Sequence, residues 1–221
     1  RQDTEMRSQL AGMVSGQLHQ TLKLNSERTL YMKVTGIIAE YNPFHKGHAY
    51  HIQKAKELTG ADYIIVVMSG DFTQRGMPAI LDKYTRARMA LACGADLVLE
   101  LPVRFACASA EFFAGGAVSL LNGSGVVDQL CFGSEEGSVE GMQLAARILN
   151  EEPQGFRDLL KNSLKQGMSF PAARSQVLGK YLCTLHSLSE KNLSAFSDTL
   201  LSSPNNILGI EYCRALLRLN S

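Results

Sequence analysis

Two histidines, His45 and His48, flank Gly47 in the segment GIIAEYNPFHKGHAYH (36–51). An imidazole can donate a hydrogen bond to a phosphoryl oxygen, and two of them together can follow the negative charge that develops when pyrophosphate leaves. Gly47 has no Cβ, so a phosphate can approach the main chain there. This combination favours nucleotidyl transfer, although two histidines at this spacing also occur as capping or packing residues.

The two histidines lie where a strand gives way to a helix. Residues 33–39 are apolar on both faces and rich in β-branched side chains, which predicts a short buried strand. Asn42-Pro43 ends that strand, and apolar residues at helical spacing predict a helix from Gly47 to Thr59-Gly60. The free N–H groups and the dipole at such a helix start attract an anion. This context supports a functional interpretation of the histidines.

Strands and helices alternate through the following part of the chain. Strand patterns at 62–68, 96–101 and 129–132 alternate with helical patterns at 82–93, 106–121 and 139–149, the second helix being interrupted at Gly115-Gly116. From 151 to 221 only helical patterns occur, at 156–165, 172–185 and 206–219. The alternation predicts an α/β fold with a doubly wound parallel sheet and ligands at the carboxyl ends of its strands, followed by an all-helical segment.

Five sequence blocks stand in order along the chain: AEYNPFHKGH (39–48), MSGDFTQRGMPA (68–79), ADLVLELP (95–102), FGSE (132–135) and PNNILG (204–209). With these blocks the chain resembles the H-x-G-H nucleotidyltransferase superfamily and, within it, the bacterial tRNA-Met cytidine acetate ligases. The resemblance implies a Rossmann-like nucleotidyltransferase fold. It also implies a ligase that activates acetate as acetyl-adenylate with ATP and acetylates the wobble cytidine of elongator tRNA-Met to N4-acetylcytidine.

The resemblance also assigns roles to single residues. It implies that His45, His48 and Lys83 are catalytic, and that Lys83 neutralises charge on the α-phosphate. It implies an ATP site made of Ile38, Ala39, Glu40, Tyr41, Asn42, Pro43, Phe44, His45, Lys46, Gly47, His48, His51, Gly133 and Asn205. ATP would enter as its Mg²⁺ complex, and no metal site of the protein's own and no tightly bound prosthetic group is expected.

Several of these residues also allow simpler interpretations. The planar fork of Arg75 suits the acetate carboxylate or a phosphate, or Arg75 is a solvated loop residue or a partner of Asp71. His51 is a phosphate neighbour or a plain helix-face histidine, and Gly133 is a nucleotide contact or a turn glycine. One of Asn205 and Asn206 is expected to be a helix N-cap.

The expected tRNA surface is a basic edge formed by Lys83, Arg86 and Arg88. Because the net charge is only +1, RNA phosphates must meet such a local basic face and not a globally basic protein.

Composition limits the remaining classes. The chain has 221 residues, 45% of them hydrophobic, which suits one globular domain with a sizeable core. No apolar run of membrane-spanning length and no secretion signal occur, so a cytoplasmic protein without a membrane contact is expected. The five cysteines fit neither a zinc site nor a disulfide framework and are expected to be buried thiols.

Three segments are expected along the chain. Residues 1–31 lack steady periodicity and are interpreted as a leader or an appended extension outside the fold, or else as a helical extension. Residues 32–150 form the nucleotidyltransferase-like domain, and 151–221 form a helical segment that is truncated relative to the family.

The family's second phosphate-gripping motif, a serine-rich turn followed by arginine, does not occur in this sequence. The resemblance therefore covers about the N-terminal half of a typical member, and the activity of this chain alone is in question. Two rival functions stay open: another small-molecule adenylyltransferase, or a non-catalytic nucleotide-binding or tRNA-binding module. The sequence indicates no oligomeric state.

Overall fold

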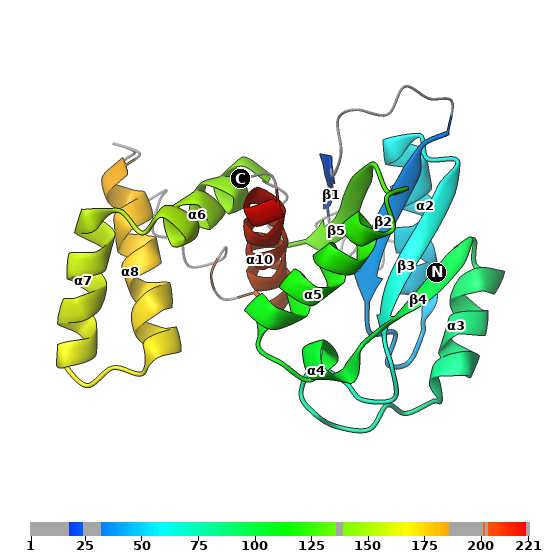
Figure 1. The fold of residues 1–221 in the computed structure, drawn as a ribbon, viewed down its shortest axis with the longest axis horizontal. Coiled ribbons are helices and arrows are strands. Elements are labelled where there is room, and N and C mark those ends of the chain that lie inside the picture. Colours follow the sequence, from blue (N-terminus) through cyan, green and yellow to red (C-terminus); the bar gives the residue numbers. More distant parts are fainter. Residues whose placement is uncertain (1–17, 24–31, 136–138, 186–200, 202, 220–221) are drawn as a thin grey trace, which may run out of the picture. The chain divides into compact units, whose positions relative to one another are not determined.

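The computed structural model describes residues 18–23, 32–135, 139–185, 201 and 203–219. The chain forms two compact units, one over His19–Gly133 and one built on Ser134–Ser221. Figure 1 shows the helices and strands of both.

The first unit is built on a sheet with the strand order β1-β5-β2-β3-β4. β2 pairs in parallel with both β3 and β5, and β4 pairs in parallel with β3. The four predicted strands are confirmed, with ends that differ by at most two residues. The strands are β1 (Leu18–Lys23), β2 (Val34–Ala39), β3 (Tyr63–Ser69), β4 (Leu97–Leu101) and β5 (Gln129–Ser134).

β1 falls within residues 1–31, where no element of the fold was expected. It takes the edge of the sheet beside β5. Its sequence, LHQTLK, alternates apolar and polar residues only in part, so the pattern gave no strand signal. The rest of the expected leader, residues 1–17 and 24–31, lies outside the described residues.

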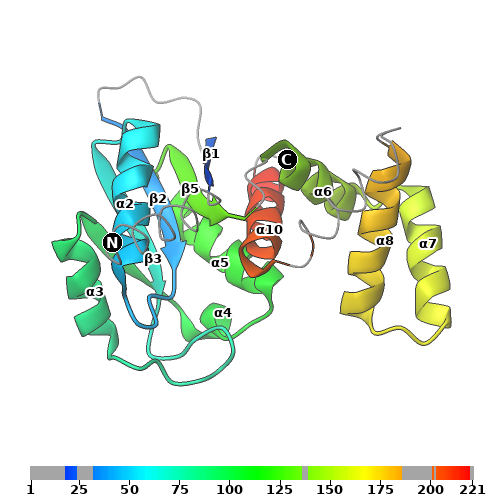
Figure 2. The ribbon, with the colours of Figure 1, turned by 180° about the vertical axis from the view of Figure 1, so that it is seen from behind.

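Helices cover both faces of the sheet (Figures 1 and 2). They are α2 (Lys46–Thr59), α3 (Lys83–Ala92), α4 (Val103–Ala106) and α5 (Ala110–Gly123). α2 and α3 follow β2 and β3 and share one apolar cluster, whereas α5 carries the chain across the other face to β5. The order of the strands therefore reverses between β2 and β5, which is where open parallel sheets bind ligands. The doubly wound parallel sheet is confirmed.

The two faces of the sheet are packed differently. On one face Ile37 of β2 and Ile64 of β3 are fully buried against Ile52 of α2. On the other face Gly36 allows α5 to approach, because a Cβ at this position would lie 2.7 Å from Cδ1 of Leu121. Burial of these apolar side chains holds the helices on the sheet and fixes the strand ends that follow.

Three aspartates fasten the amino end of the sheet. Asp62, Asp96 and Asp128 each accept a hydrogen bond of 2.7–2.8 Å from a backbone N–H, those of Lys33, Ile64 and Val34 respectively. Such charge-assisted bonds satisfy N–H groups at the strand starts. The opposite, carboxyl end of the sheet carries the loops with the predicted site residues.

One predicted helix of the first unit is wrong in its boundaries. The segment 106–121 does not form one helix interrupted at its glycines but two helices, and α5 runs unbroken through Gly115-Gly116. Gly116 is needed for packing between α4 and α5, because a Cβ at this position would collide with the ring of Phe105 on α4. This glycine serves a close helix contact and does not end a helix.

The second unit is helical, as predicted. Its helices are α6 (Val139–Glu151), α7 (Gln154–Lys165), α8 (Phe170–Leu185) and α10 (Pro204–Leu219). α6 packs on α10 and α7 packs on α8 (Figure 2). The guanidinium of Arg214 on α10 donates a hydrogen bond of 3.1 Å to Oδ1 of Asn150 on α6 and lies 3.3 Å from Glu211. The bond to Asn150 joins the two helices beyond their apolar packing, whereas Glu211 lies on α10 itself and balances the charge of Arg214.

No helix among the described residues is both long and apolar enough to span a membrane. The expectation of buried thiols is correct for Cys131 and Cys213 and wrong for Cys93 and Cys107, which are exposed. Both exposed thiols lie at the carboxyl end of a helix, where the chain reaches the surface.

Candidate active site

His45 and His48 cap the start of α2, because each imidazole accepts a hydrogen bond from a backbone N–H at this turn. His45 is the N-cap residue, and its Nδ1 accepts a hydrogen bond of 3.1 Å from the N–H of Gly47. In return, Nδ1 of His48 accepts a hydrogen bond of 3.2 Å from the N–H of His45. The two rings stack with centroids 3.7 Å apart. The arrangement repeats the reciprocal capping box of serine and glutamate, here built from two imidazoles.

This capping assigns the tautomer of both rings. Because each Nδ1 accepts a hydrogen bond, the proton of the neutral ring sits on Nε2, which is then free to donate. Burial, together with the charge of neighbouring His45, lowers the pKa of His48 from 6.5 to about 4. His48 is therefore a neutral donor at pH 7. Two parallel N–H donors at a helix start suit a phosphate oxygen.

Gly47 and an aromatic cluster keep the pair in place. A Cβ on Gly47 would lie 2.9 Å from Cε1 of His45, so a larger residue would displace the stacked ring. The ring of His48 packs against Tyr41 at 4.8 Å and Phe44 at 5.5 Å between centroids. Tyr41 is fully buried, and its backbone takes the left-handed conformation with φ 52°. Strained backbone of this kind is concentrated at functional sites, which agrees with the predicted role of the segment.

The loop after β3 meets the segment that leads to the histidines. The loop closes on itself through hydrogen bonds of 2.9 Å from Thr73 N to Met77 O and from Gly76 N to Thr73 O. Its Gln74 N–H donates to the carboxylate of Glu40. The Ile80 N–H donates to Oδ1 of Asn42 at 2.7 Å. The two predicted site segments are thus in contact at the carboxyl edge of the sheet.

Arg75 lies at the tip of this loop. Its side chain is exposed and has no hydrogen bond or ion pair to any described residue, so it is not a structural partner of Asp71. Asp71 instead accepts a hydrogen bond of 3.2 Å from the N–H of Lys83. The guanidinium therefore remains available for an anion.

Arg86 has a role that the sequence did not indicate. It was expected on a basic surface edge, but it is 1% exposed. Its guanidinium donates to the backbone carbonyls of Glu40 at 2.7 Å and Ser69 at 3.0 Å, and to that of Gly70. Its Nε also donates to Leu81 O at 2.9 Å. Arg86 ties the ends of β2 and β3 together beneath the two loops and cannot contact tRNA.

Lys83 stands at the same edge, held by two carboxylates. Its ammonium lies 2.8 and 2.9 Å from the two oxygens of Glu100, at the end of β4, and 3.8 Å from Asp71. The hydrogen bond to Glu100 raises the pKa of Lys83. Glu100 is a second residue whose role the sequence did not indicate. The collision that any Cβ on Gly70 would make with its carboxylate shows how closely these strand ends approach.

Gly133 lies at the end of β5, next to the strand that leads to the histidines. Leu130 of β5 pairs with Gly36 of β2, and Gly133 lies three residues further toward the carboxyl end of the sheet. A Cβ on Gly133 would meet nothing within 4 Å, so the space beside it is open. His51 lies one turn into α2, with its Nε2 3.9 Å from the sulfur of Cys131 on β5. Both residues thus flank the switch point between β2 and β5.

The other predicted ATP-site residues differ in whether their side chains are buried or exposed to solvent. Ile38 is 7% exposed and packs in the sheet, so only its backbone can face a ligand. Pro43 and Lys46 are exposed at the turn before α2. The segment offers a ligand chiefly main-chain groups and the two imidazoles.

Asn205 belongs to the second unit. α10 begins at Pro204, so Asn205 and Asn206 lie inside its first turn, and the expectation that one of them is the N-cap is wrong. Proline is favoured at the first helical position, which shifts the start of the helix upstream. Asn206 is fully buried, and its Oδ1 accepts from Ser134 Oγ at 2.8 Å. Asn205 donates to the carboxylate of Glu135 at 2.7 Å. Two distant sequence blocks therefore meet within the second unit.

Comparison with known proteins agrees with this geometry. The family model described as HIGH Nucleotidyl Transferase matches residues 32–221. Proteins named tRNA(Met) cytidine acetate ligase from Acetivibrio thermocellus and Clostridium novyi are 53% and 52% identical to this chain over 190 residues. The matches cover 86% of this chain and 44% and 45% of theirs.

Two crystal structures of Thermotoga maritima TmcAL are similar to this chain. One is bound with alpha-thio ATP and has a TM-score of 0.79 at 47% identity. The apo form has a TM-score of 0.76 at 44% identity, and both matches cover 86% of this chain and 44% of the other. The chain thus spans about half the length of the relatives it matches. Because the family model covers most of the chain and the fold and histidine turn agree with it, the chain belongs to the HIGH Nucleotidyl Transferase family.

Proposed function

We propose that the protein is an ATP-dependent ligase that activates acetate and acetylates the wobble cytidine of elongator tRNA-Met. The observation that carries this proposal is the pair of mutually capped imidazoles at the start of α2, both with Nε2–H free to donate. The names of the relatives support the choice of acetate and tRNA as substrates. A neighbouring structure with an ATP analogue supports ATP.

In the first step a carboxylate oxygen of acetate attacks the α-phosphorus of ATP. A new P–O bond forms, the bond from the α-phosphorus to the bridging oxygen breaks, and pyrophosphate leaves. His45 and His48 donate to the α-phosphate and to the leaving group, while Arg75 orients acetate. These residues act by positioning and electrostatic stabilisation, without a covalent bond to the protein.

In the second step the exocyclic N4 of cytidine attacks the acetyl carbon. The C–O bond to the phosphate breaks, AMP leaves, and N4 loses a proton.

Lys83 acts in the first step, where it neutralises phosphate charge during adenylation. For this role its ammonium must share or exchange its contact with Glu100. Raising the pKa of Lys83 keeps it a cation for this role.

ATP would bind at the switch point as its Mg²⁺ complex. The proposed contacts are the segment from Ile38 to His48, with His51 and Gly133, and Asn205 from the second unit. The open space at Gly133 supports a nucleotide there. A tRNA substrate would make the protein RNA-binding and place it in the cytoplasm.

The test is acetate-dependent exchange of labelled pyrophosphate into ATP. By the usual cost of losing one such donor, His48→Ala should slow the exchange about a hundredfold or more. Lys56→Ala, an exposed change on the same helix, should leave the rate unchanged. Exchange that does not require acetate, with transfer of AMP to a phosphorylated small molecule, would favour another adenylyltransferase. ATP binding without any turnover would favour a non-catalytic module.

A further inference from the structure

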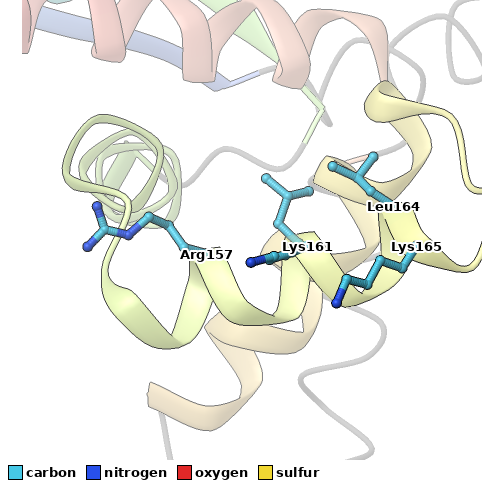
Figure 3. A pocket seen from close by; sticks show the side chains of 5 residues that line it. Arg157, Lys161, Leu164 and Lys165 are labelled. Carbon is cyan, nitrogen blue, oxygen red and sulfur yellow. The ribbon is translucent and has the colours of Figure 1, made fainter.

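A file of three cations runs along the exposed side of α7. Arg157, Lys161 and Lys165 follow one another at intervals of four residues, and all three are exposed. Four residues advance a helix by about 6 Å and keep side chains on one face. Figure 3 shows the three side chains in file with Leu164 beside them, around a shallow open hollow of about 470 Å³ that Leu160 also lines. We call these three residues the α7 basic file.

The cations of the α7 basic file have no anionic partner among the described residues. Arg157 donates a hydrogen bond of 3.0 Å to the amide oxygen of Gln154. The nearby carboxylate of Asp158 accepts from the amide nitrogen of the same glutamine, at 3.0 Å. By contrast, Lys54 and Arg174 are each paired with a glutamate. Three like charges are thus held one turn apart, and none of them forms an ion pair with Asp158 or with another described carboxylate, an arrangement that an external polyanion would stabilise.

The other side of α7 anchors the file. Phe156 is 1% exposed and meets the ring of Tyr181 on α8 edge-on, with centroids 6.0 Å apart. Gly155 allows this contact, because a Cβ there would lie 3.3 Å from the Tyr181 ring. The basic face is therefore presented from a packed helix pair.

A nucleic acid fits this surface better than a membrane does. An interfacial helix needs a broad apolar face for the acyl boundary. Here Phe156 is buried against α8, and Leu159 and Leu164 are the large apolar side chains of α7 that stay exposed, each by 37%. The phosphates of a nucleic acid can bind to a local row of cations. With a net charge of only +1, this protein must bind RNA through such a local basic surface. The expected alternative, the edge of Lys83, Arg86 and Arg88, is not free, since Arg86 is buried and Lys83 is paired.

We propose that the α7 basic file is a docking surface for the phosphate backbone of RNA, and that the tRNA substrate is the RNA it holds. The identity of that RNA rests on the proposed function. The contact itself is to phosphates, so it positions the RNA and does not read its sequence.

The test compares two triple variants of equal charge. R157Q/K161Q/K165Q removes the file, and K33Q/K56Q/R104Q removes one arginine and two lysines that are exposed elsewhere, just before β2, on α2 and on α4. Binding of a tRNA-Met transcript is measured by fluorescence anisotropy between 50 and 200 mM salt. Each lost phosphate contact should reduce the slope of log K against log salt by about 0.7–0.9, so the first variant should lose about two to three units of slope. It should also bind at least tenfold more weakly at the lower salt, while the control stays near wild type.

Wild-type slope and affinity in the first variant, or equal losses in both variants, would overturn the proposal. Binding to phosphatidylserine vesicles that depends on the α7 basic file, without RNA binding, would also overturn it. The single variant Lys161→Glu, with its thermal melting followed by circular dichroism, guards against misfolding and should also weaken RNA binding. Acetate-dependent pyrophosphate exchange, measured without tRNA, separates the two ideas. If exchange fails while RNA binding depends on the file, the proposed function is wrong and the RNA surface stands.

Discussion

Arg86 is expected to be the residue whose loss most damages the carboxyl end of the sheet. Its guanidinium donates to the carbonyls of Leu81, Glu40, Ser69 and Gly70. Arg86→Met would leave these acceptors unpaired, at about 1–3 kcal/mol for each one that stays buried. Water and local relaxation recover part of this, and breaking a buried charged network costs about 3–5 kcal/mol in comparable cases. We expect a loss of unfolding free energy of about 3–5 kcal/mol.

The assay is urea unfolding followed by circular dichroism, together with thermal melting. At about 2–4 °C per kcal/mol for a chain of this size, the melting temperature should fall by roughly 6–20 °C. Arg88→Met is the matched control, because Arg88 lies on the same helix, is exposed and should lose less than about 1 kcal/mol. Arg86→Lys keeps the charge without the fork and should fall between the two. If Arg86→Met melts with the control, the guanidinium does not hold the strand ends.

Three further predictions concern the site itself. Gly133→Ala should not lower the melting temperature, because its Cβ meets no atom within 4 Å. Gly115→Ala, equally free of a clash, should leave it unchanged or raise it slightly, because alanine favours the interior of α5. Only Gly133→Ala should weaken ATP binding in calorimetric titration, and equal affinities would place the nucleotide elsewhere. Between pH 6.5 and about 4, His48 is protonated in the unfolded chain but not in the folded protein. The free energy of unfolding of the wild type should therefore decrease as the pH is lowered through this window. In His48→Gln the fall, measured from urea midpoints, should be smaller, and an identical fall would contradict the lowered pKa. Glu100→Gln should lower the pKa of Lys83, measured by NMR titration of its ε-carbon, because the bond to Glu100 is the main cause that raises it.

The alternation of strands and helices could be predicted because it is a local pattern. β2 and β3 are largely buried apolar runs of six and seven residues between turn signals, and β4 is a partly exposed apolar run of five at the edge of the sheet. Their order follows from right-handed crossovers. The break at Gly115-Gly116 was predicted wrongly, because the role of Gly116 depends on Phe105, which reaches it only in the folded state. A glycine in a helix can serve packing as well as termination.

The sequence located the histidines of the candidate site but not the residues that position the loops around them. His45 and His48 carry a motif, and their turn follows from the strand and helix around it. The role of Arg86 was not predictable, because its partners Glu40 and Ser69 are 46 and 17 residues away and are backbone carbonyls, which have no sequence signature. The pairing of Lys83 with Glu100 likewise depends on the neighbouring strand ends. Motifs locate reacting groups, whereas the groups that position them are chosen by the tertiary structure.

In the proposed function, ATP phosphates bind to the Nε2–H groups of His45 and His48. NMR of protein labelled with ¹⁵N in its histidine rings, recorded while ATP is added, tests this contact most directly. We expect both rings to begin as Nε2–H tautomers and ATP to shift the Nε2 signals of both. ATP binding that leaves these two signals unmoved, or a starting tautomer with the proton on Nδ1, would contradict it.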